Sequence, residues 1–111
     1  MFSIVIALYN KEETIKKTLS SVMAQEFKDF EVLVINDGST DASLRIVESF
    51  NEDKIKILST EHKGVAAARN RGIVEAKHPY IAFLDADDWW APSYLHMHAE
   101  SIAKFQRNNF I

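Results

Sequence analysis

The stretch at residues 80–90, YIAFLDADDWW, joins a short apolar run to an acidic turn. Residues 80–84 are typical of a strand of a parallel sheet that is covered on both faces. Three carboxylates, Asp85, Asp87 and Asp88, follow at the carboxyl end of this predicted strand. Open α/β sheets bind ligands at the carboxyl ends of their strands, and divalent cations such as Mg²⁺ prefer oxygen ligands. The stretch therefore predicts a cation site, with an ordinary polar turn as the alternative.

The composition indicates a single globular domain, residues 1–111, because 47% of the residues are hydrophobic and 26% are charged. A net charge of -3 without a stripe of Lys and Arg argues against nucleic acid as a partner. The sequence has no cysteine, which favours a reducing compartment, and its longest apolar run, residues 4–9, is too short to be a membrane segment. We therefore expect a cytoplasmic protein, with the cytoplasmic face of a membrane as an alternative location.

Strand and helix patterns alternate four times along the chain. The predicted strands are residues 2–8, 31–36, 54–59 and 80–84, and helices are predicted to start near residues 10, 41, 64 and 92. This alternation predicts an α/β fold in which a mainly parallel sheet carries helices on both faces. Asn10 and Glu13 have the spacing of a capping box, and Gly72 would allow close packing of the third helix. Residues 110 and 111 predict the start of a fifth strand.

Polar side chains follow three of the predicted strands. Tyr9 ends the first strand, Asp37 ends the second, and the acidic turn ends the fourth. We expect these groups to meet, because parallel strands present their carboxyl ends at one edge of the sheet. An aromatic ring beside a carboxylate suits a nucleobase, with Tyr9 stacking on its face and Asp37 accepting a hydrogen bond from a ring N–H. The alternatives are a packing role for Tyr9 and a self-stabilised turn at Asp37.

Four blocks of sequence together resemble the family 2 inverting glycosyltransferases, which have the GT-A nucleotide-sugar-binding fold. The blocks are VIALYN at 5–10, VINDGSTD at 34–41, GVAAARNRG at 64–72 and FLDADD at 83–88. Their order and spacing match the family over essentially the whole chain, but only over the donor-binding half of a typical member. The resemblance implies a Rossmann-like GT-A fold that is truncated before the acceptor-binding half. It also implies that the general base lies beyond Ile111.

The resemblance implies a base pocket in this chain. Ala7 and Tyr9 match the family's uracil pocket, and Asp37 matches the residue that hydrogen-bonds the base. Arg69 matches a position near the nucleotide, where its guanidinium would offset diphosphate charge. The alternative for Arg69 is a solvated helix residue. We expect UDP to be the nucleotide.

The resemblance also implies a metal-assisted diphosphate site, because Asp85-Ala86-Asp87 matches the family's DXD motif. In the family, the first aspartate contacts the ribose or diphosphate and the second coordinates the cation. We therefore expect Asp87 to be the metal ligand and Asp85 to contact the nucleotide. Few protein ligands are needed, because Mg²⁺ fills its remaining positions with water and phosphate oxygens. The expected cofactor is Mn²⁺ or Mg²⁺.

The predicted function is transfer of a sugar from a nucleotide-sugar donor to a saccharide or other hydroxyl acceptor, as in the synthesis of a cell-surface polysaccharide. The nearest candidate base is Asp88, although a neighbouring cation would lower its basicity. We expect the 111-residue chain alone to transfer no sugar and its exposed sheet edge to favour self-association. The alternative function is a non-catalytic α/β module that binds a nucleotide.

Overall fold

The four predicted strands form one parallel sheet with the order β3-β2-β1-β4. The computed structural model describes residues 1–108, and the side chains of residues 1–106. The strands are β1 (Phe2–Leu8), β2 (Phe30–Asp37), β3 (Ile55–Thr60) and β4 (Tyr80–Phe83). Each begins and ends within one residue of its predicted bounds. The α/β fold with a parallel sheet is therefore confirmed.

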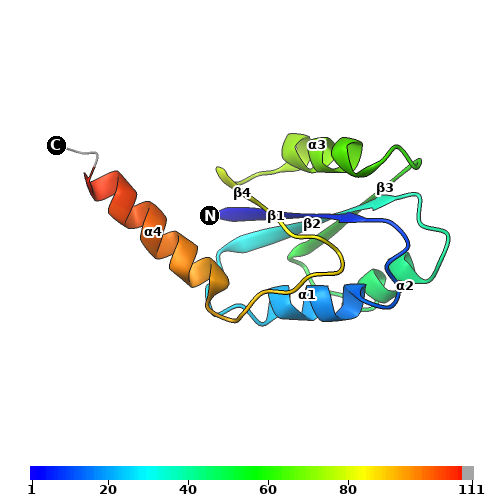
Figure 1. The fold of residues 1–111 in the computed structure, drawn as a ribbon, viewed down its shortest axis with the longest axis horizontal. Helices are drawn as coiled ribbons and strands as arrows, with labels where there is room; N and C mark the ends of the chain where they lie inside the picture. Colours follow the sequence, from blue (N-terminus) through cyan, green and yellow to red (C-terminus); the bar gives the residue numbers. More distant parts are fainter. Residues whose placement is uncertain (109–111) are drawn as a thin grey trace.

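Helices cover both faces of the sheet. They are α1 (Ile15–Met23), α2 (Ser43–Glu48), α3 (Val65–Glu75) and α4 (Tyr94–Asn108). Figure 1 shows α3 on one face, α1 and α2 on the other, and α4 extending away from the sheet. The predicted three-layer arrangement is thus present. Within residues 1–108, no helix has both the length and the apolar character needed to cross a membrane.

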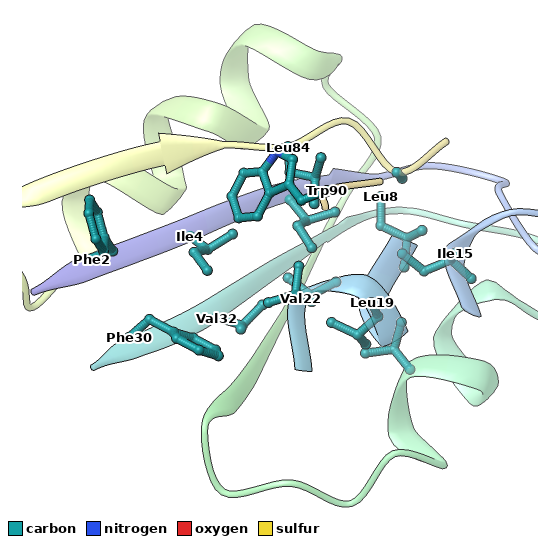
Figure 2. Close-up of a cluster of buried hydrophobic side chains, with 14 of the residues drawn as sticks. Phe2, Ile4, Leu8, Ile15, Leu19, Val22, Phe30, Val32, Leu84 and Trp90 are labelled. Atoms are coloured by element: carbon teal, nitrogen blue, oxygen red, sulfur yellow. The ribbon is translucent and has the colours of Figure 1, made fainter. Parts of the chain in front are cut away.

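The main hydrophobic core lies between the sheet and α1. Figure 2 shows this cluster, to which β1, β2, α1 and the segment after β4 contribute. Its fully buried members include Ile4, Leu8, Ile15, Leu19, Val22 and Val32. Burying one such aliphatic side chain contributes roughly 1.5–3 kcal/mol. Because β1 and β2 are the central strands of the sheet, their apolar residues are buried on both faces. This burial holds the two strands, and therefore their carboxyl ends, in place.

Helix α3 packs very closely on β1 through Gly72. A Cβ atom at this position would lie 2.3 Å from Cγ1 of Val5, far inside van der Waals contact. Glycine therefore allows a backbone approach that no other residue would permit without movement. The predicted close packing of this helix is confirmed, and it holds α3 against the central strand β1.

Strand β4 lies at one edge of the sheet, and one of its two faces is exposed. The prediction that both of its faces are covered is therefore wrong. Tyr80 and Ala82 point toward the main core, but Ile81 and Phe83 remain 36% and 44% exposed. The reason is that α3 packs over β1 and β2 and leaves the outer face of β4 open. An open edge is compatible with self-association, which stays a prediction. The predicted fifth strand lies outside the described residues.

The predicted capping box at Asn10 is also wrong, because α1 begins at Ile15 and its N-terminal residue makes no side-chain cap. Asn10 has a positive φ of 50° and turns its side chain toward the loop after β2. Its Oδ1 accepts hydrogen bonds from the backbone N–H groups of Thr40, at 2.8 Å, and Asp41, at 3.3 Å. Asn10 therefore ties together the segments that follow β1 and β2.

Candidate functional site

The carboxyl ends of β1, β2 and β4 surround a cleft of about 360 Å³. It contains five of the six residues that the sequence assigned to a nucleotide and metal site. The lining residues are Ala7, Leu8, Tyr9, Lys11, Asp37, His62, Val65, Asp85, Ala86 and Asp87. The parallel sheet thus brings together side chains that are up to 80 positions apart in the sequence, as expected from the rule for strand ends.

Asp37, at the end of β2, is buried and accepts three hydrogen bonds from the loop before α3. Its Oδ1 accepts from the backbone N–H of Lys63 at 2.8 Å. Its Oδ2 accepts from the backbone N–H of Gly64 at 3.0 Å and faces Nδ1 of His62 at 3.0 Å. The carboxylate therefore orders the loop. Because a carboxylate has about four acceptor positions, one position on Oδ1 remains for a ligand.

Tyr9 lies at the mouth of the cleft, with 39% of its surface exposed. Its ring stacks on the imidazole of His62, with centroids 4.0 Å apart and planes inclined by 22°. One face of the tyrosine is therefore occupied within the chain. The predicted stacking of a base on Tyr9 is therefore possible only on the ring face that is turned away from His62.

The three aspartates of the acidic turn have different partners. Oδ1 of Asp85 accepts from Nη2 of Arg69 at 2.9 Å, and Oδ2 of Asp87 lies 3.5 Å from Nζ of Lys11. Oδ1 of Asp88 instead accepts from the backbone N–H of the next residue. Within residues 1–108, no group of three His, Asp or Glu side chains has an arrangement that could hold a metal ion. A cation in this cleft would need ligand oxygens from the nucleotide and water.

The acidic turn is anchored to α1 through its middle residue. The backbone carbonyl of Ala86 accepts hydrogen bonds from the hydroxyl groups of Thr14, at 2.9 Å, and Thr18, at 3.0 Å. Ala86 is itself buried. This anchoring fixes the backbone between Asp85 and Asp87, so that both carboxylates stay at the cleft.

Arg69 does not line the main cleft. Its guanidinium bridges to Asp85 and lies over the ring of Phe83, 5.8 Å from the centroid. A neighbouring cavity of about 490 Å³ begins there and also contains Asp88 and Trp89. Asp85 therefore lines both cavities, whereas Arg69 and Asp88 line only the second one.

Sequence reasoning missed the two remaining polar side chains of the cleft, those of Lys11 and His62. Lys11 follows the first strand end by three residues and supplies a cation beside Asp87. His62 follows the third strand, whose end was not considered although the same rule for parallel strands applies to it. Applying the rule to all four strands would have indicated His62.

Comparison with known proteins matches this chain to glycosyltransferases. The family model described as "Glycosyl transferase family 2" matches residues 3–111. The chain is 39% identical over 105 residues to the E. coli protein named UDP-Glc:alpha-D-GlcNAc-diphosphoundecaprenol beta-1,3-glucosyltransferase WfgD, with 94% of this chain and 42% of WfgD covered. It is 36% identical over 106 residues to glycosyltransferase GlyA of Streptococcus pneumoniae, with 94% of this chain and 15% of GlyA covered.

Solved structures agree with this match. Residues 1–349 of S. aureus TarS, in complex with UDP-GlcNAc, superpose with a TM-score of 0.87 at 33% identity, covering 93% of this chain and 31% of that one. The mannosyltransferase PcManGT of Pyrobaculum calidifontis, in complex with GDP-Man and Mn²⁺, gives a TM-score of 0.78 at 24% identity, covering 85% and 30%. The second match supports the fold alone.

A parallel sheet with this cleft at its carboxyl edge, together with the match to TarS, defines the GT-A glycosyltransferase fold. The chain belongs to glycosyl transferase family 2, in agreement with the four sequence blocks. It spans 42% of the length of WfgD and 15% of the length of GlyA. The activity, substrates and partners of the whole protein are therefore matters for proposal.

Proposed function

We propose that residues 1–111 form the donor-binding part of a glycosyltransferase that transfers a sugar from a UDP-sugar to a hydroxyl acceptor. One observation carries the proposal: Tyr9, Asp37 and the two aspartates of the DXD motif line a single cleft. Two relatives support UDP as the nucleotide. TarS has been crystallised with UDP-GlcNAc, and the name of WfgD specifies UDP-Glc as its donor.

The base end of the cleft is formed by Ala7, Tyr9 and Asp37. In this proposal, the free acceptor position on Oδ1 of Asp37 receives the N–H of a uracil ring, and the exposed face of Tyr9 stacks on the base. Ala7 provides a small side chain at the floor, which leaves room for the ring. This end of the cleft therefore recognises the nucleoside.

The diphosphate end of the cleft holds Lys11, Asp85 and Asp87, with Arg69 behind Asp85. Two carboxylates match the needs of Mg²⁺ or Mn²⁺, which take hard oxygen ligands and complete their coordination with phosphate and water. The fixed backbone at Ala86 keeps both carboxylates within the cleft. When bound, the cation stabilises the charge that develops on the departing diphosphate. We propose Asp87 as its ligand, with Asp85 and Arg69 holding the nucleotide.

Transfer also needs a base that removes the acceptor proton. We propose that the base and the acceptor-binding wall belong to a part of the protein that this chain does not include, as the limited coverage of TarS supports. Synthesis of a cell-surface polysaccharide in the cytoplasm remains part of this proposal. The competing function is a module that binds the nucleotide without transfer, and only an activity assay separates the two.

Isothermal titration of the chain with UDP, in Mn²⁺ and in excess EDTA, tests the proposal. We expect saturable binding in Mn²⁺ and much weaker binding in EDTA, because the diphosphate then faces uncompensated carboxylates. Uridine is the control, since it retains the base and lacks the diphosphate. No binding of UDP in Mn²⁺ at millimolar concentration would reject the donor site. Equal affinity for UDP in both buffers would reject only the proposed role of the metal and would leave the nucleotide site in place.

A further inference from the structure

His62 connects the two side chains that form the base end of the cleft. Its Nδ1 lies 3.0 Å from Oδ2 of Asp37 and 3.1 Å from the carbonyl oxygen of the same residue. Its ring stacks on Tyr9 at a centroid distance of 4.0 Å. The histidine side chain is 54% exposed, so these two contacts define its place in the cleft.

Hydrogen-bond chemistry determines which ring nitrogen carries the proton. Both atoms near Nδ1 are oxygens of Asp37 that can only accept when the carboxylate is charged. Nδ1 must therefore donate, and in the neutral ring Nε2 carries the lone pair. This donation fills the second acceptor position of Oδ2, because the backbone N–H of Gly64 fills the first.

The contact with Tyr9 restricts the tyrosine in a similar way. Since His62 covers one face of the phenol ring, only the opposite face can stack on a base. The stacked imidazole also prevents the exposed tyrosine ring from rotating freely. His62 thereby leaves one acceptor position on Asp37 and one ring face on Tyr9 for the ligand.

The backbone around His62 is held independently of its side chain. A Cβ at Gly38 would lie 2.8 Å from the backbone nitrogen of His62, which shows how closely this loop approaches the end of β2. The N–H groups of Lys63 and Gly64 both donate to Asp37. Replacing the exposed imidazole should therefore leave the loop in place.

We propose that His62 is a specificity-determining residue of the donor site, which makes the cleft select uracil over cytosine. This inference rests on the proposed function. Uracil has a ring N–H that the single free position on Asp37 can accept, whereas neutral cytosine has no ring N–H and offers an exocyclic amino group. Without the imidazole donor, Oδ2 regains an acceptor position that can receive this amino group. The stacking contact of His62 supports affinity for either base, because stacking is tolerant of base identity.

Two variants separate these contributions. His62→Ala removes both the ring and the donor, so it opens the acceptor position on Oδ2 of Asp37 that another ring stacked on Tyr9 would still cover. His62→Asn keeps an N–H donor, whose side-chain nitrogen lies about as far along the side chain as Nδ1, but loses the ring. Each variant is titrated with UDP and CDP in Mn²⁺, and its melting temperature is measured. Glu61→Gln, a change at the preceding exposed residue, is the control.

For the parent chain, we expect UDP to bind at least about tenfold more tightly than CDP, since a hydrogen bond to a charged group is worth that much. His62→Ala should weaken UDP binding about five- to tenfold through loss of the ring, whereas CDP affinity should stay nearly unchanged because the opened acceptor position offsets that loss, so the preference should fall about tenfold. His62→Asn should weaken both nucleotides about five- to tenfold and keep their ratio, as loss of the ring that orders the stacking partner predicts. A purely structural role would change both variants in the same way.

The titrations distinguish failure of the proposed function from failure of the proposed role of His62. If the parent chain binds no UDP, the proposed function fails and the role of His62 fails with it. If the parent binds UDP but does not prefer it to CDP, or if His62→Ala keeps the full preference, only the role of His62 is overturned. Loss of UDP and CDP affinity by the same factor in both variants, together with a lower melting temperature, would also overturn it.

Discussion

The ammonium nitrogen of Lys11 lies 3.5 Å from Oδ2 of Asp87, the carboxylate that we propose as metal ligand. Both side chains are about half exposed, so the ion pair between them is weak and easily exchanged. A divalent cation that carries a diphosphate brings more charge and more ligand oxygens than the lysine does. We therefore expect Lys11 to leave Asp87 and turn toward the phosphates when the donor binds.

Asp87→Ala tests the assignment of the metal ligand. Because this change removes an oxygen ligand from a site with few protein ligands, it should abolish the gain in UDP affinity that Mn²⁺ gives. The matched control is Asp88→Ala, one position further along, where the carboxylate bonds to the next backbone N–H and faces the second cavity. Titration of both variants with UDP, with and without Mn²⁺, makes the comparison. Parental metal dependence in Asp87→Ala would remove Asp87 from the site.

Tyr9→Ala should weaken UDP binding by about 1–3 kcal/mol, the range for stacking of a base on an aromatic side chain. Tyr9→Phe is the control, because it keeps the ring and the contact with His62 and removes only the hydroxyl group. Isothermal titration and thermal melting are measured together. If Tyr9→Ala lowers mainly the melting temperature and leaves UDP affinity intact, Tyr9 is a packing residue.

The acidic turn and the base pocket were partly predictable because five of the six assigned residues lie at or just after the end of a strand, and a parallel sheet gathers strand ends at one edge. Ala7, Tyr9, Asp37, Asp85 and Asp87 all reached the cleft for this reason. The partners of these side chains were not predictable. Which of several nearby polar groups pairs with a carboxylate depends on loop conformations of the kind seen at residues 62–64, and these follow no hydrophobic period.

The strands were predictable to within one residue because their apolar runs are continuous, and the starts of α2, α3 and α4 to within two residues, but the start of α1 was not. Asn10 has a suitable side chain and spacing for a cap, yet it takes a positive φ and binds the backbone of Thr40 instead. Hydrogen bonds between the Asn10 side chain and the loop after β2 thus replaced the expected helix cap. Exposure of Phe83 was missed because an apolar run looks the same in a central strand and in an edge strand.

Gly72→Ala should lower the free energy of unfolding by about 1–3 kcal/mol, the usual cost of overpacking, since its Cβ would meet the side chain of Val5. Combining it with Val5→Ala makes room for the new methyl group. The double variant should therefore be more stable than the sum of the two single changes predicts. Urea denaturation of the parent, both single variants and the double variant measures this coupling. Strict additivity would mean that the helix moves instead.

Glu31 is a buried carboxylate at the opposite end of the sheet from the cleft. It accepts hydrogen bonds from Oγ of Ser3 at 2.6 Å and from the backbone N–H of Lys77 at 2.7 Å, and Nζ of Lys56 lies 3.4 Å away. Burial acts to raise the pKa of Glu31, but these hydrogen bonds and the lysine charge together outweigh it and hold the pKa below its usual range. The charged form of Glu31 is therefore favoured in the folded chain.

Because the pKa of Glu31 is lower in the folded chain than in the unfolded one, its contribution to stability is present above the unfolded pKa of about 4.3 and is lost as pH falls through the folded pKa. Glu31→Gln should cost about 1–3 kcal/mol at pH 7. The difference in the free energy of unfolding between Glu31→Gln and the parent chain should shrink as the pH is lowered from 5 toward 3. Urea denaturation over this pH range provides the measurement, with the exposed Glu48→Gln as control. A difference that does not change with pH would show that the charge of Glu31 contributes nothing.

The 111-residue chain should transfer no sugar to an acceptor, even where it binds UDP in Mn²⁺. Transfer requires a base and an oriented acceptor, which contribute about 10²- to 10⁴-fold and up to about 7–11 kcal/mol, respectively. The nearest spare carboxylate, Asp88, faces the second cavity and already accepts a hydrogen bond from the backbone. We therefore expect slow hydrolysis of the donor at most.

The assay incubates the chain with Mn²⁺, UDP-Glc or UDP-GlcNAc and a mixture of glycan acceptors, and detects products by mass spectrometry. The control is the same mixture with Asp87→Ala, which identifies any hydrolysis that depends on the proposed metal ligand. Robust transfer by the parent chain would contradict the prediction, and its loss in Asp88→Asn would then identify Asp88 as the base. Binding without transfer or hydrolysis would instead favour a nucleotide-binding module, because a donor site poised for catalysis should release some sugar to water.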